Sequence, residues 1–155
     1  RSPTASATGY VRGIWMTDLI RRASSDDAEA CAAIIDAWME RTEWFPRGIT
    51  YAELVPMFRN GLPKREAYVI GDPVEGYLSM DEDAHVWGFY VARRGAGLGT
   101  ALMNRAKAGR DFVSLNTHHA NTRAHAFYQR EGFAFVGEPW LGDDGIDEIR
   151  MEWRA

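Results

Sequence analysis

The stretch VARRGAGLGT, residues 91–100, joins an almost entirely apolar segment (84–91) to a helical pattern that runs to about residue 108. Gly95, Gly97 and Gly99 allow the backbone to bend tightly and to come close to a ligand, because glycine has no Cβ. The free N–H groups and the positive dipole end of the following helix then point into the loop. Arg93 and Arg94 add charged hydrogen-bond donors. The stretch predicts a binding loop for phosphate oxygens, and a plain tight strand-to-helix turn is the alternative.

Two other kinds of phosphate-binding loop fit this stretch less well. A Walker A loop has a Lys directly before its Ser or Thr, whereas Gly99 precedes Thr100 here. A Rossmann loop, G-x-G-x-x-G, places its third glycine one residue later, and an acidic residue follows about 20 positions on. This chain has Thr117, His118 and His119 in that region. A nucleotide-binding protein is therefore kept as the weaker hypothesis.

The hydrophobic patterns on both sides of this loop predict one mixed α/β domain with the order β-α-α-β-β-β-α-β-α-β-β. Segment 84–91 is expected to be a central strand that is covered on both faces. Ser24 with Asp27, and Thr50 with Glu53, predict capped helix starts. The expected strands are 18–23, 66–70, 74–80, 84–91, 112–116, 133–136 and 147–153, and the expected helices are 27–42, 50–61, a segment ending near 108, and 121–131.

Composition limits the classes of protein to consider. The chain has 155 residues, 46% of them hydrophobic, which fits a single globular domain. Its net charge of −4 argues against a general nucleic-acid binder, and a single cysteine, Cys31, excludes cysteine-rich metal sites. No apolar run is long enough to span a membrane, and the first 13 residues lack the apolar core of a signal peptide. We expect a cytoplasmic protein with no metal, nucleic acid or membrane partner. We also expect residues 1–16 to be a flexible lead-in or tag remnant and residues 17–155 to form the domain.

A second motif, NTRAHAFYQREGF at residues 121–133, follows the strand after the glycine loop. It resembles the N-x-x-A-x-x-F-Y-x-x-x-G-F helix of the GNAT N-acetyltransferase superfamily. Arg94, Gly97 and Gly99 are likewise similar to that family's R/Q-x-x-G-x-G/A loop. The order of elements over residues 18–153 is also the family's order. The resemblance implies the GNAT fold, acetyl-CoA as cosubstrate and an amine as acceptor.

The resemblance also implies roles for individual residues. The amine would attack the thioester directly, with a backbone N–H near 89–91 polarising the acetyl carbonyl and Tyr128 protonating the departing thiolate. Asn121 and Tyr128 lie seven positions apart, nearly two helical turns, so their side chains are expected on one side of the helix. Cys31, on the first helix, is expected away from the cleft. The implied coenzyme-binding residues are Phe89, Tyr90, Val91, Arg93, Arg94, Gly95, Ala96, Gly97, Leu98, Gly99, Thr100, Asn121 and Ala124.

Several of these residues also have purely structural interpretations. Asn121 is a favoured helix N-cap, and Tyr128 could be a core aromatic. The exit from the strand at Val91 is about two residues shorter than is usual in the family, which leaves the bulge geometry of that strand open. Candidate general bases near the strand are Glu82, Asp83 and His85. The remaining polar and aromatic candidates each have two interpretations: His118 and His119 as exposed loop residues or as lining of the acceptor site; Trp44, Phe45 and Tyr51 as packing or as an acceptor wall; Asp143, Asp144, Asp147 and Glu148 as a solvated turn and edge or as an acidic rim for a cationic amine.

The function that we expect is therefore acetyl transfer from acetyl-CoA to a primary amine. A non-catalytic acyl-CoA-binding or sensing domain of the same fold is the alternative, and thioester turnover with a panel of amines distinguishes the two. The acceptor stays open among polyamines, amino acids, antibiotics, peptide N-termini and lysine side chains. Edge strands near the C-terminus also suggest a homodimer.

Overall fold

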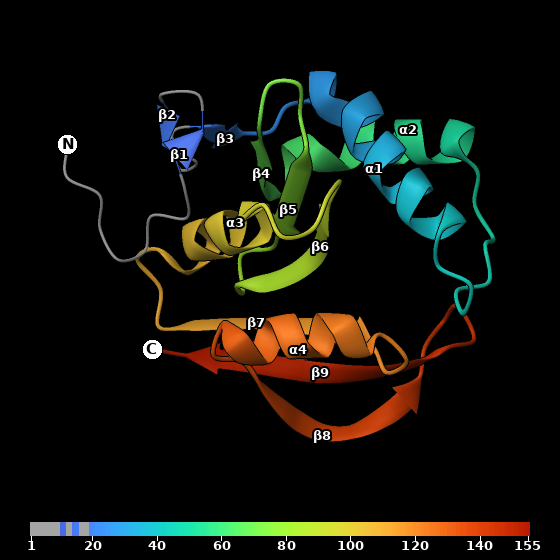
Figure 1. Ribbon diagram of the computed structural model, residues 1–155. Coiled ribbons are helices and arrows are strands. Elements are labelled where there is room, and N and C mark those ends of the chain that lie inside the picture. Colours follow the sequence, from blue (N-terminus) through green and yellow to red (C-terminus); the bar gives the residue numbers. More distant parts are fainter. Residues whose placement is uncertain (1–9, 12–13, 16–18) are drawn as a thin grey trace.

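The computed structural model describes residues 10–11, 14–15 and 19–155 (Figure 1). Its main element is a seven-stranded sheet with the strand order β3-β4-β5-β6-β7-β9-β8. Every neighbouring pair in this sheet is antiparallel except β6 and β7, which are parallel. The strands are β3 (Ile20–Arg22), β4 (Glu66–Ile70), β5 (Gly76–Met80), β6 (His85–Val91), β7 (Phe112–His118), β8 (Ala134–Leu141) and β9 (Asp147–Arg154).

Four α-helices flank the sheet, in the order that the sequence predicted. Both predicted capping boxes are present: Ser24 with Asp27 begins a short 3-10 turn before α1, and Thr50 with Glu53 begins α2. The mixed α/β fold is thus confirmed. The helices are α1 (Ala28–Glu40), α2 (Tyr51–Gly61), α3 (Leu98–Lys107) and α4 (Thr122–Arg130).

The N-terminal prediction falls largely outside the described residues. Two short strands, β1 (Tyr10–Val11) and β2 (Ile14–Trp15), pair with each other as a separate two-stranded sheet. The proposed division at residue 16 remains a prediction. Within the part of the chain that the structure describes, no helix is both long and apolar enough to cross a membrane.

Alternate residues of β4 belong to two different core clusters, because successive side chains of a strand point to opposite faces. Ala67 and Val69 pack with Cys31 and Leu62 beneath α1 and α2. Tyr68 and Ile70 face the other way and join the larger core that contains residues of α3, α4, β7 and β9. The helix pairs α1–α2 and α3–α4 therefore cover opposite faces of the sheet (Figure 1).

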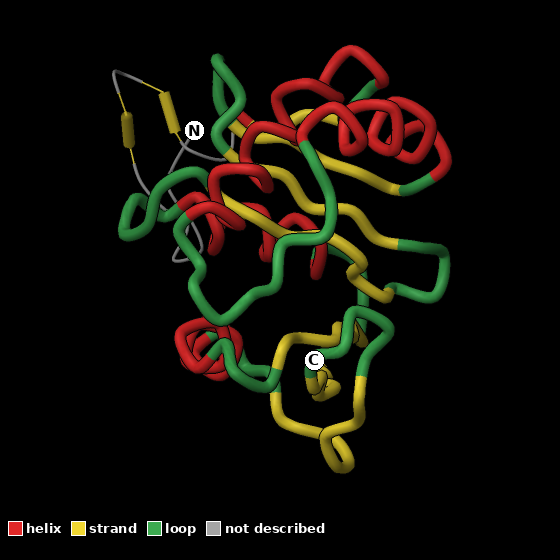
Figure 2. Tube along the Cα trace, turned by 90° about the vertical axis from the view of Figure 1, so that its right-hand side faces the viewer, coloured by secondary structure: helices red, strands yellow, loops and turns green. Residues whose placement is uncertain are grey.

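The sheet opens between its two parallel strands. β6 and β7 pair only at His85 with Ser114 and at Val86 with Leu115, and from there the two groups of strands diverge (Figures 1 and 2). Trp87 has no partner on β5, because Met80 pairs with Val86 and Ser79 pairs with Gly88. The bulge geometry of this strand, which the short strand exit left open, is therefore one extra residue on β6 at Trp87.

The expectation that segment 84–91 is covered on both faces is wrong for most of its length. His85 and Val86 are buried, but the Trp87 side chain is 59% exposed and Phe89–Val91 are only partly buried. The physical reason is the loss of the parallel neighbour after Val86. The C-terminal half of β6 borders an opening instead of another strand.

Two strands run further than the sequence indicated. β7 extends to His118, two residues beyond the predicted end, and this extension carries Thr117 and His118 to the opening. β8 extends to Leu141 as an edge strand, with a register shift between Val136 and Trp140 and every residue exposed. On β9, Ile149 and Met151 are buried on one face of the strand.

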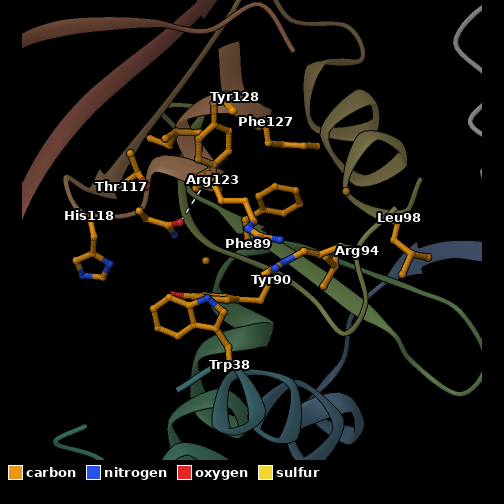
Figure 3. A pocket seen from close by; sticks show the side chains of 18 of the residues that line it. Trp38, Phe89, Tyr90, Arg94, Leu98, Thr117, His118, Arg123, Phe127 and Tyr128 are labelled. Atoms are coloured by element: carbon orange, nitrogen blue, oxygen red, sulfur yellow. Dashed lines mark hydrogen bonds between the residues drawn. The ribbon is translucent and has the colours of Figure 1, made fainter. Parts of the chain in front are cut away.

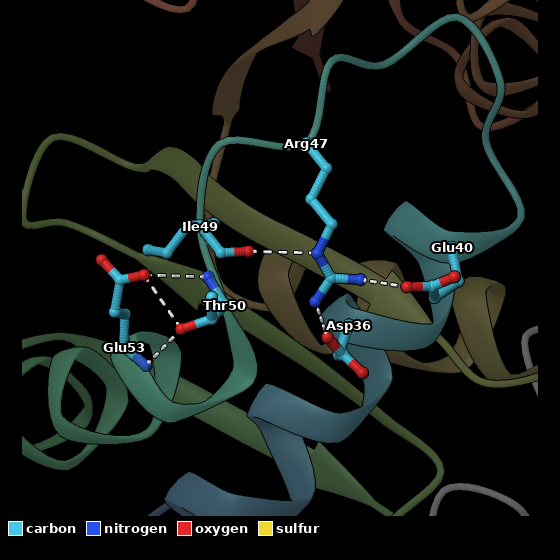
Figure 4. Close-up of polar contacts among 6 residues, drawn as sticks. All are labelled: Asp36, Glu40, Arg47, Ile49, Thr50 and Glu53. Atoms are coloured by element: carbon cyan, nitrogen blue, oxygen red, sulfur yellow. Dashed lines mark hydrogen bonds and ion pairs between the residues drawn. The ribbon is translucent and has the colours of Figure 1, made fainter.

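Arg47 links the loop between α1 and α2 to helix α1 through hydrogen bonds and ion pairs (Figure 4). Arg47 donates from Nη1 to the Glu40 carboxylate at 2.6 Å and from Nη2 to the Asp36 carboxylate, and its Nε donates to the Ile49 carbonyl at 3.2 Å. This three-way contact fixes the path of residues 41–50 over the C-terminal end of α1. It therefore holds Trp44 and Phe45 close to the opening between β6 and β7.

Candidate active site

The divergence of β6 and β7 creates a cleft of about 500 Å³. Its walls come from β6, from the glycine loop and the start of α3, from the end of β7, and from α4 and α1. Figure 3 shows Phe89 and Tyr128 on one side of this space and Trp38 on the other, with His118 and Arg94 at opposite ends. Of the residues predicted from the two motifs, all line the cleft except Ala96, which packs against the larger core.

The glycine loop has the backbone conformation that its sequence indicated. Gly95 and Gly97 have φ angles of +74° and +78°, a region that residues with a Cβ rarely adopt. Gly97 is the N-cap of α3, so the first N–H groups of that helix open toward the cleft. At Gly99 a Cβ would lie 3.2 Å from the Phe127 ring, so this glycine allows α3 to pack close to α4.

Positive charge gathers at the same end of the cleft, although the chain as a whole is acidic. Arg94, Arg123 and Arg41 all line it. Burial, together with the positive charges of Arg123 and Arg41, lowers the pKa of Arg94 from its usual value. Arg93 instead pairs with Glu75, with 2.6 Å between its Nε and the carboxylate. Three guanidinium groups next to free helix N–H groups form a site for an anionic ligand.

The edge of β6 that borders the cleft has no strand partner beyond Val86. Phe89, Tyr90 and Val91 pair with β5 on their other edge only. Their free backbone groups can therefore bind an extended ligand as an additional strand would bind, and can donate an N–H to a carbonyl oxygen in the cleft.

Helix α4 brings Asn121 and Tyr128 to the same cleft, as their spacing predicted. Asn121 is the N-cap, because its Oδ1 accepts from the Ala124 N–H at 3.2 Å. The Tyr128 ring packs among Phe89, Phe127 and Phe133 and is 8% exposed. Burial, and to a lesser degree the neighbouring Tyr90, raises the pKa of Tyr128 above its usual range. Among residues 19–155 no group hydrogen-bonds its hydroxyl, which is free to serve a ligand.

The other end of the cleft holds a histidine and two carboxylates. His118 lines the cleft, and its Nε2 lies 2.8 Å from Asp144 Oδ2 in the β8–β9 turn. Glu148 faces His118 across the β7–β9 ladder and also lines the cleft. Burial raises the pKa of Glu148; the charge of His118 opposes this shift and those of Asp144 and Asp143 add to it.

Of the two interpretations, the exposed loop and the solvated edge are therefore wrong for His118 and Glu148, because both side chains line the cleft. His118 belongs to a strand, not to a loop, and it pairs with Glu148 in the β7–β9 register. A sequence signal for this existed. Ser114, Asn116 and His118 alternate with the apolar residues of β7, which is the pattern of a strand with one polar face.

Aromatic side chains from α1 and from the loop after it surround His118. Trp38 lines the cleft and stacks with His118 at 6.4 Å between ring centroids. Trp44 and Phe45 lie behind the cleft wall, each 5.4 Å from the same imidazole. Tyr51 is 40% exposed and lies outside the cleft lining. Of the three aromatic residues proposed for an acceptor wall, two contact the wall and one does not.

The general bases suggested by the sequence do not reach this cleft. His85 is buried, its Nδ1 lies 2.7 Å from Ser114 Oγ, and burial lowers its pKa. Together with Asp83 it lines a different hollow on the α1–α2 face of the sheet. Glu82 is exposed in the β5–β6 turn and lines neither space. The reason is the direction of their strand: these residues lie at the start of β6, and the cleft opens along its end.

Comparison with known proteins decides the family. The sequence pattern of the family "Acetyltransferase (GNAT) domain" matches residues 48–155, more than half of the chain. The chain belongs to the GNAT family of acetyl-CoA-dependent N-acetyltransferases. Both motifs that carried the resemblance, the glycine loop and the α4 helix, lie inside the matched region. The nucleotide-binding hypothesis is thereby set aside.

Individual GNAT relatives agree with this assignment. The peptidyl-lysine N-acetyltransferase YiaC of Escherichia coli K12 is 26% identical over 129 residues, covering 78% of this chain and 88% of the relative. The peptidyl-lysine N-acetyltransferase YjaB of Salmonella typhimurium is 27% identical, covering 81% and 90%. The solved structure of apo YjaB from Escherichia coli has the same fold, with a TM-score of 0.71, 22% identity and coverage of 86% and 95%. The structure of yncA from Salmonella typhimurium, which was solved with acetyl-CoA, also has this fold. Its TM-score is 0.65 and its identity 21%, and the match covers 87% of this chain and 92% of yncA.

The cleft fits the cosubstrate of a GNAT enzyme. The left-handed glycines, the N-terminus of α3 and the arginine cluster suit the phosphates of coenzyme A. The free edge of β6 suits an extended pantetheine arm.

Cys31 lies outside the cleft and is fully buried, and burial raises the pKa of its thiol to about 12. It is therefore no nucleophile for a covalent route. In the described part of the chain, no three His, Cys, Asp or Glu side chains are placed to hold a metal ion.

Proposed function

We propose that this enzyme acetylates the side-chain amine of lysine residues in a peptide or protein. The observation that carries the proposal is that the two ends of the cleft have opposite charge. Arg94, Arg123 and Arg41 line it near the glycine loop, whereas Asp144 and Glu148 lie near its other end. An anionic cosubstrate and a cationic amine are therefore attracted to opposite ends of one space. The names of YiaC and YjaB support lysine as the acceptor.

The proposed reaction is a direct transfer in which acetyl-CoA supplies the activated thioester. The N–H groups that face the cleft, those of Phe89 and Val91, stabilise the negative charge that develops on the acetyl oxygen. The Tyr128 hydroxyl gives its proton to the departing thiolate. Its raised pKa keeps this hydroxyl protonated at neutral pH, and the same apolar surroundings raise the basicity of a thiolate formed beside it.

The acceptor is tested with three peptides that differ only in their amines. One has a single lysine and a blocked N-terminus, one has a free N-terminus and no lysine, and one has neither. We expect acetyl-CoA consumption and a mass increase of one acetyl group with the first peptide only. Transfer to the free N-terminus alone would overturn lysine as the acceptor. Binding of acetyl-CoA without turnover on peptides, polyamines or free amino acids would support the non-catalytic alternative.

A homodimer remains a proposal for the β8 edge. This strand has no partner on its outer side within the described sheet, and Phe135, Val136, Trp140 and Leu141 are each at least 40% exposed. Pairing of two such edges would cover this apolar surface. We expect light scattering to give the mass of two chains, and Trp140→Lys to give the mass of one. A monomer mass for the unmodified protein at high concentration would rule the dimer out.

A further inference from the structure

His118 has one ring nitrogen engaged and one free. Its Nε2 lies 2.8 Å from Asp144 Oδ2, and among the described residues none hydrogen-bonds Nδ1. A carboxylate accepts only from an N–H, so the neutral ring carries its proton on Nε2 and a lone pair on Nδ1. An imidazole fixed in one tautomer by a carboxylate is the arrangement that allows histidine to take up a proton in other enzymes.

The position of the ring is fixed from several directions. Trp38, Trp44 and Phe45 contact it from the α1 side. The carbonyl oxygen of His118 lies 3.1 Å from His125 Nε2 on α4, which ties the end of β7 to that helix. Only 18% of the His118 side chain is exposed, yet it lines the cleft. A side chain held in this way can meet a substrate in one defined orientation.

The charges around this end of the cleft favour a cation. Glu148 lies directly opposite His118 in the strand register, and Asp144 holds the far side of the ring. The aromatic faces of Trp38 and Tyr90, which line the cleft beside them, also attract cations. The titratable or charged groups near His118 are Asp143 and Asp144 of the β8–β9 turn, Glu148 of β9, Tyr90 of β6 and His125 of α4, whereas Arg41 after α1 lies beside Arg94.

We propose that His118 is the general base of the reaction, that Asp144 is its positioning residue, and that Glu148 binds the acceptor ammonium. This inference rests on the proposed function, because it assumes a protonated amine as acceptor. It replaces Glu82, Asp83 and His85, which the structure places outside the cleft.

Protons and bonds balance in this scheme. His118 Nδ1 takes one proton from the ammonium, and the free amine attacks the thioester carbon, so that a C–N bond forms as the C–S bond breaks. Tyr128 gives a proton to the thiolate, and the amide nitrogen releases its second proton to water. Both side chains then recover their starting states by exchange with water. One proton is released for each acetyl group transferred.

The test is the dependence of kcat/KM on pH for the lysine peptide, with His118→Gln as the variant. In the unmodified enzyme we expect a plateau around neutral pH, because the base removes a proton from the ammonium form of the acceptor. The variant reacts only with the small fraction of lysine side chains that are already neutral. Its kcat/KM should be lower by ~10²–10⁴-fold at neutral pH and should rise about tenfold per pH unit toward the lysine pKa of about 10.4. A variant that keeps the neutral plateau of the unmodified enzyme would overturn the proposal.

Three further variants make the result specific. Asp144→Asn should lower kcat with little change in KM, because the lost carboxylate no longer holds the Nε2–H tautomer of His118. Glu148→Gln should raise the KM for the peptide more than it lowers kcat. His119→Gln, at the exposed neighbouring position, should match the unmodified enzyme. If His118→Gln does not fold, an unchanged kcat in Asp144→Asn overturns the proposal. No lysine transfer by the unmodified enzyme would instead refute the proposed function itself.

Discussion

Replacing Tyr128 by phenylalanine is expected to lower kcat by ~10²-fold or more, the range for loss of a general acid. The ring contacts with Phe89, Phe127 and Phe133 remain in this variant, and only the hydroxyl is lost. Acetyl-CoA affinity should change little, because the proton moves only in the transition state. Steady-state kinetics and a direct binding measurement on one preparation test both statements.

The same variant separates the catalytic interpretation from the structural one. No described residue hydrogen-bonds the hydroxyl, so its removal leaves no buried partner unsatisfied and the melting temperature should hold. A lower melting temperature with unchanged turnover per folded molecule would assign Tyr128 to the core alone. A Tyr128→Phe enzyme with full activity would leave the family assignment intact and would end this mechanism.

Replacing Gly97 by valine is expected to abolish coenzyme A binding. Gly97 lies at φ +78° at the N-terminus of α3 and lines the cleft, so a branched side chain there distorts the loop and obstructs its N–H groups. For the unmodified protein, coenzyme A at 100 times its Kd stabilises the fold by about 2.7 kcal/mol, which is a melting shift of roughly 5–10 °C. The variant should show no such shift.

Gly109→Val is the matched control, since Gly109 has a φ of +74°, open space around it and a position outside the cleft. Both variants carry a comparable backbone strain of about 1–2 kcal/mol, and both should melt a few degrees lower without ligand. Only Gly109→Val should keep the shift with coenzyme A. A folded Gly97→Val protein with unchanged affinity would show that the phosphates bind elsewhere.

Short-range patterns in the sequence determine much of this protein. The two capping boxes, the left-handed Gly95 and Gly97, and the joint approach of Asn121 and Tyr128 to one cleft all follow from residues close together in the chain. Hydrogen bonds between positions three apart, a backbone angle that only glycine adopts freely, and the helical period are local quantities. The sequence alone therefore predicted the order of elements and the residues that line the proposed coenzyme half of the cleft.

Only the tertiary structure decided the acceptor half. His118, Asp144 and Glu148 come from β7, a turn and β9, and Trp38 comes from α1, so nothing in the local sequence places them together. The sequence could not show where β6 and β7 part, because this depends on pairing between strands more than 20 residues apart: His85 pairs with Ser114, Val86 with Leu115, and no further pair follows. That separation turns the end of β6 into a cleft wall and leaves His85 behind it, bonded to Ser114. The two ends of β6 face different surroundings because its parallel neighbour turns away after Val86. Closeness to this strand in the sequence therefore did not identify a base in the cleft.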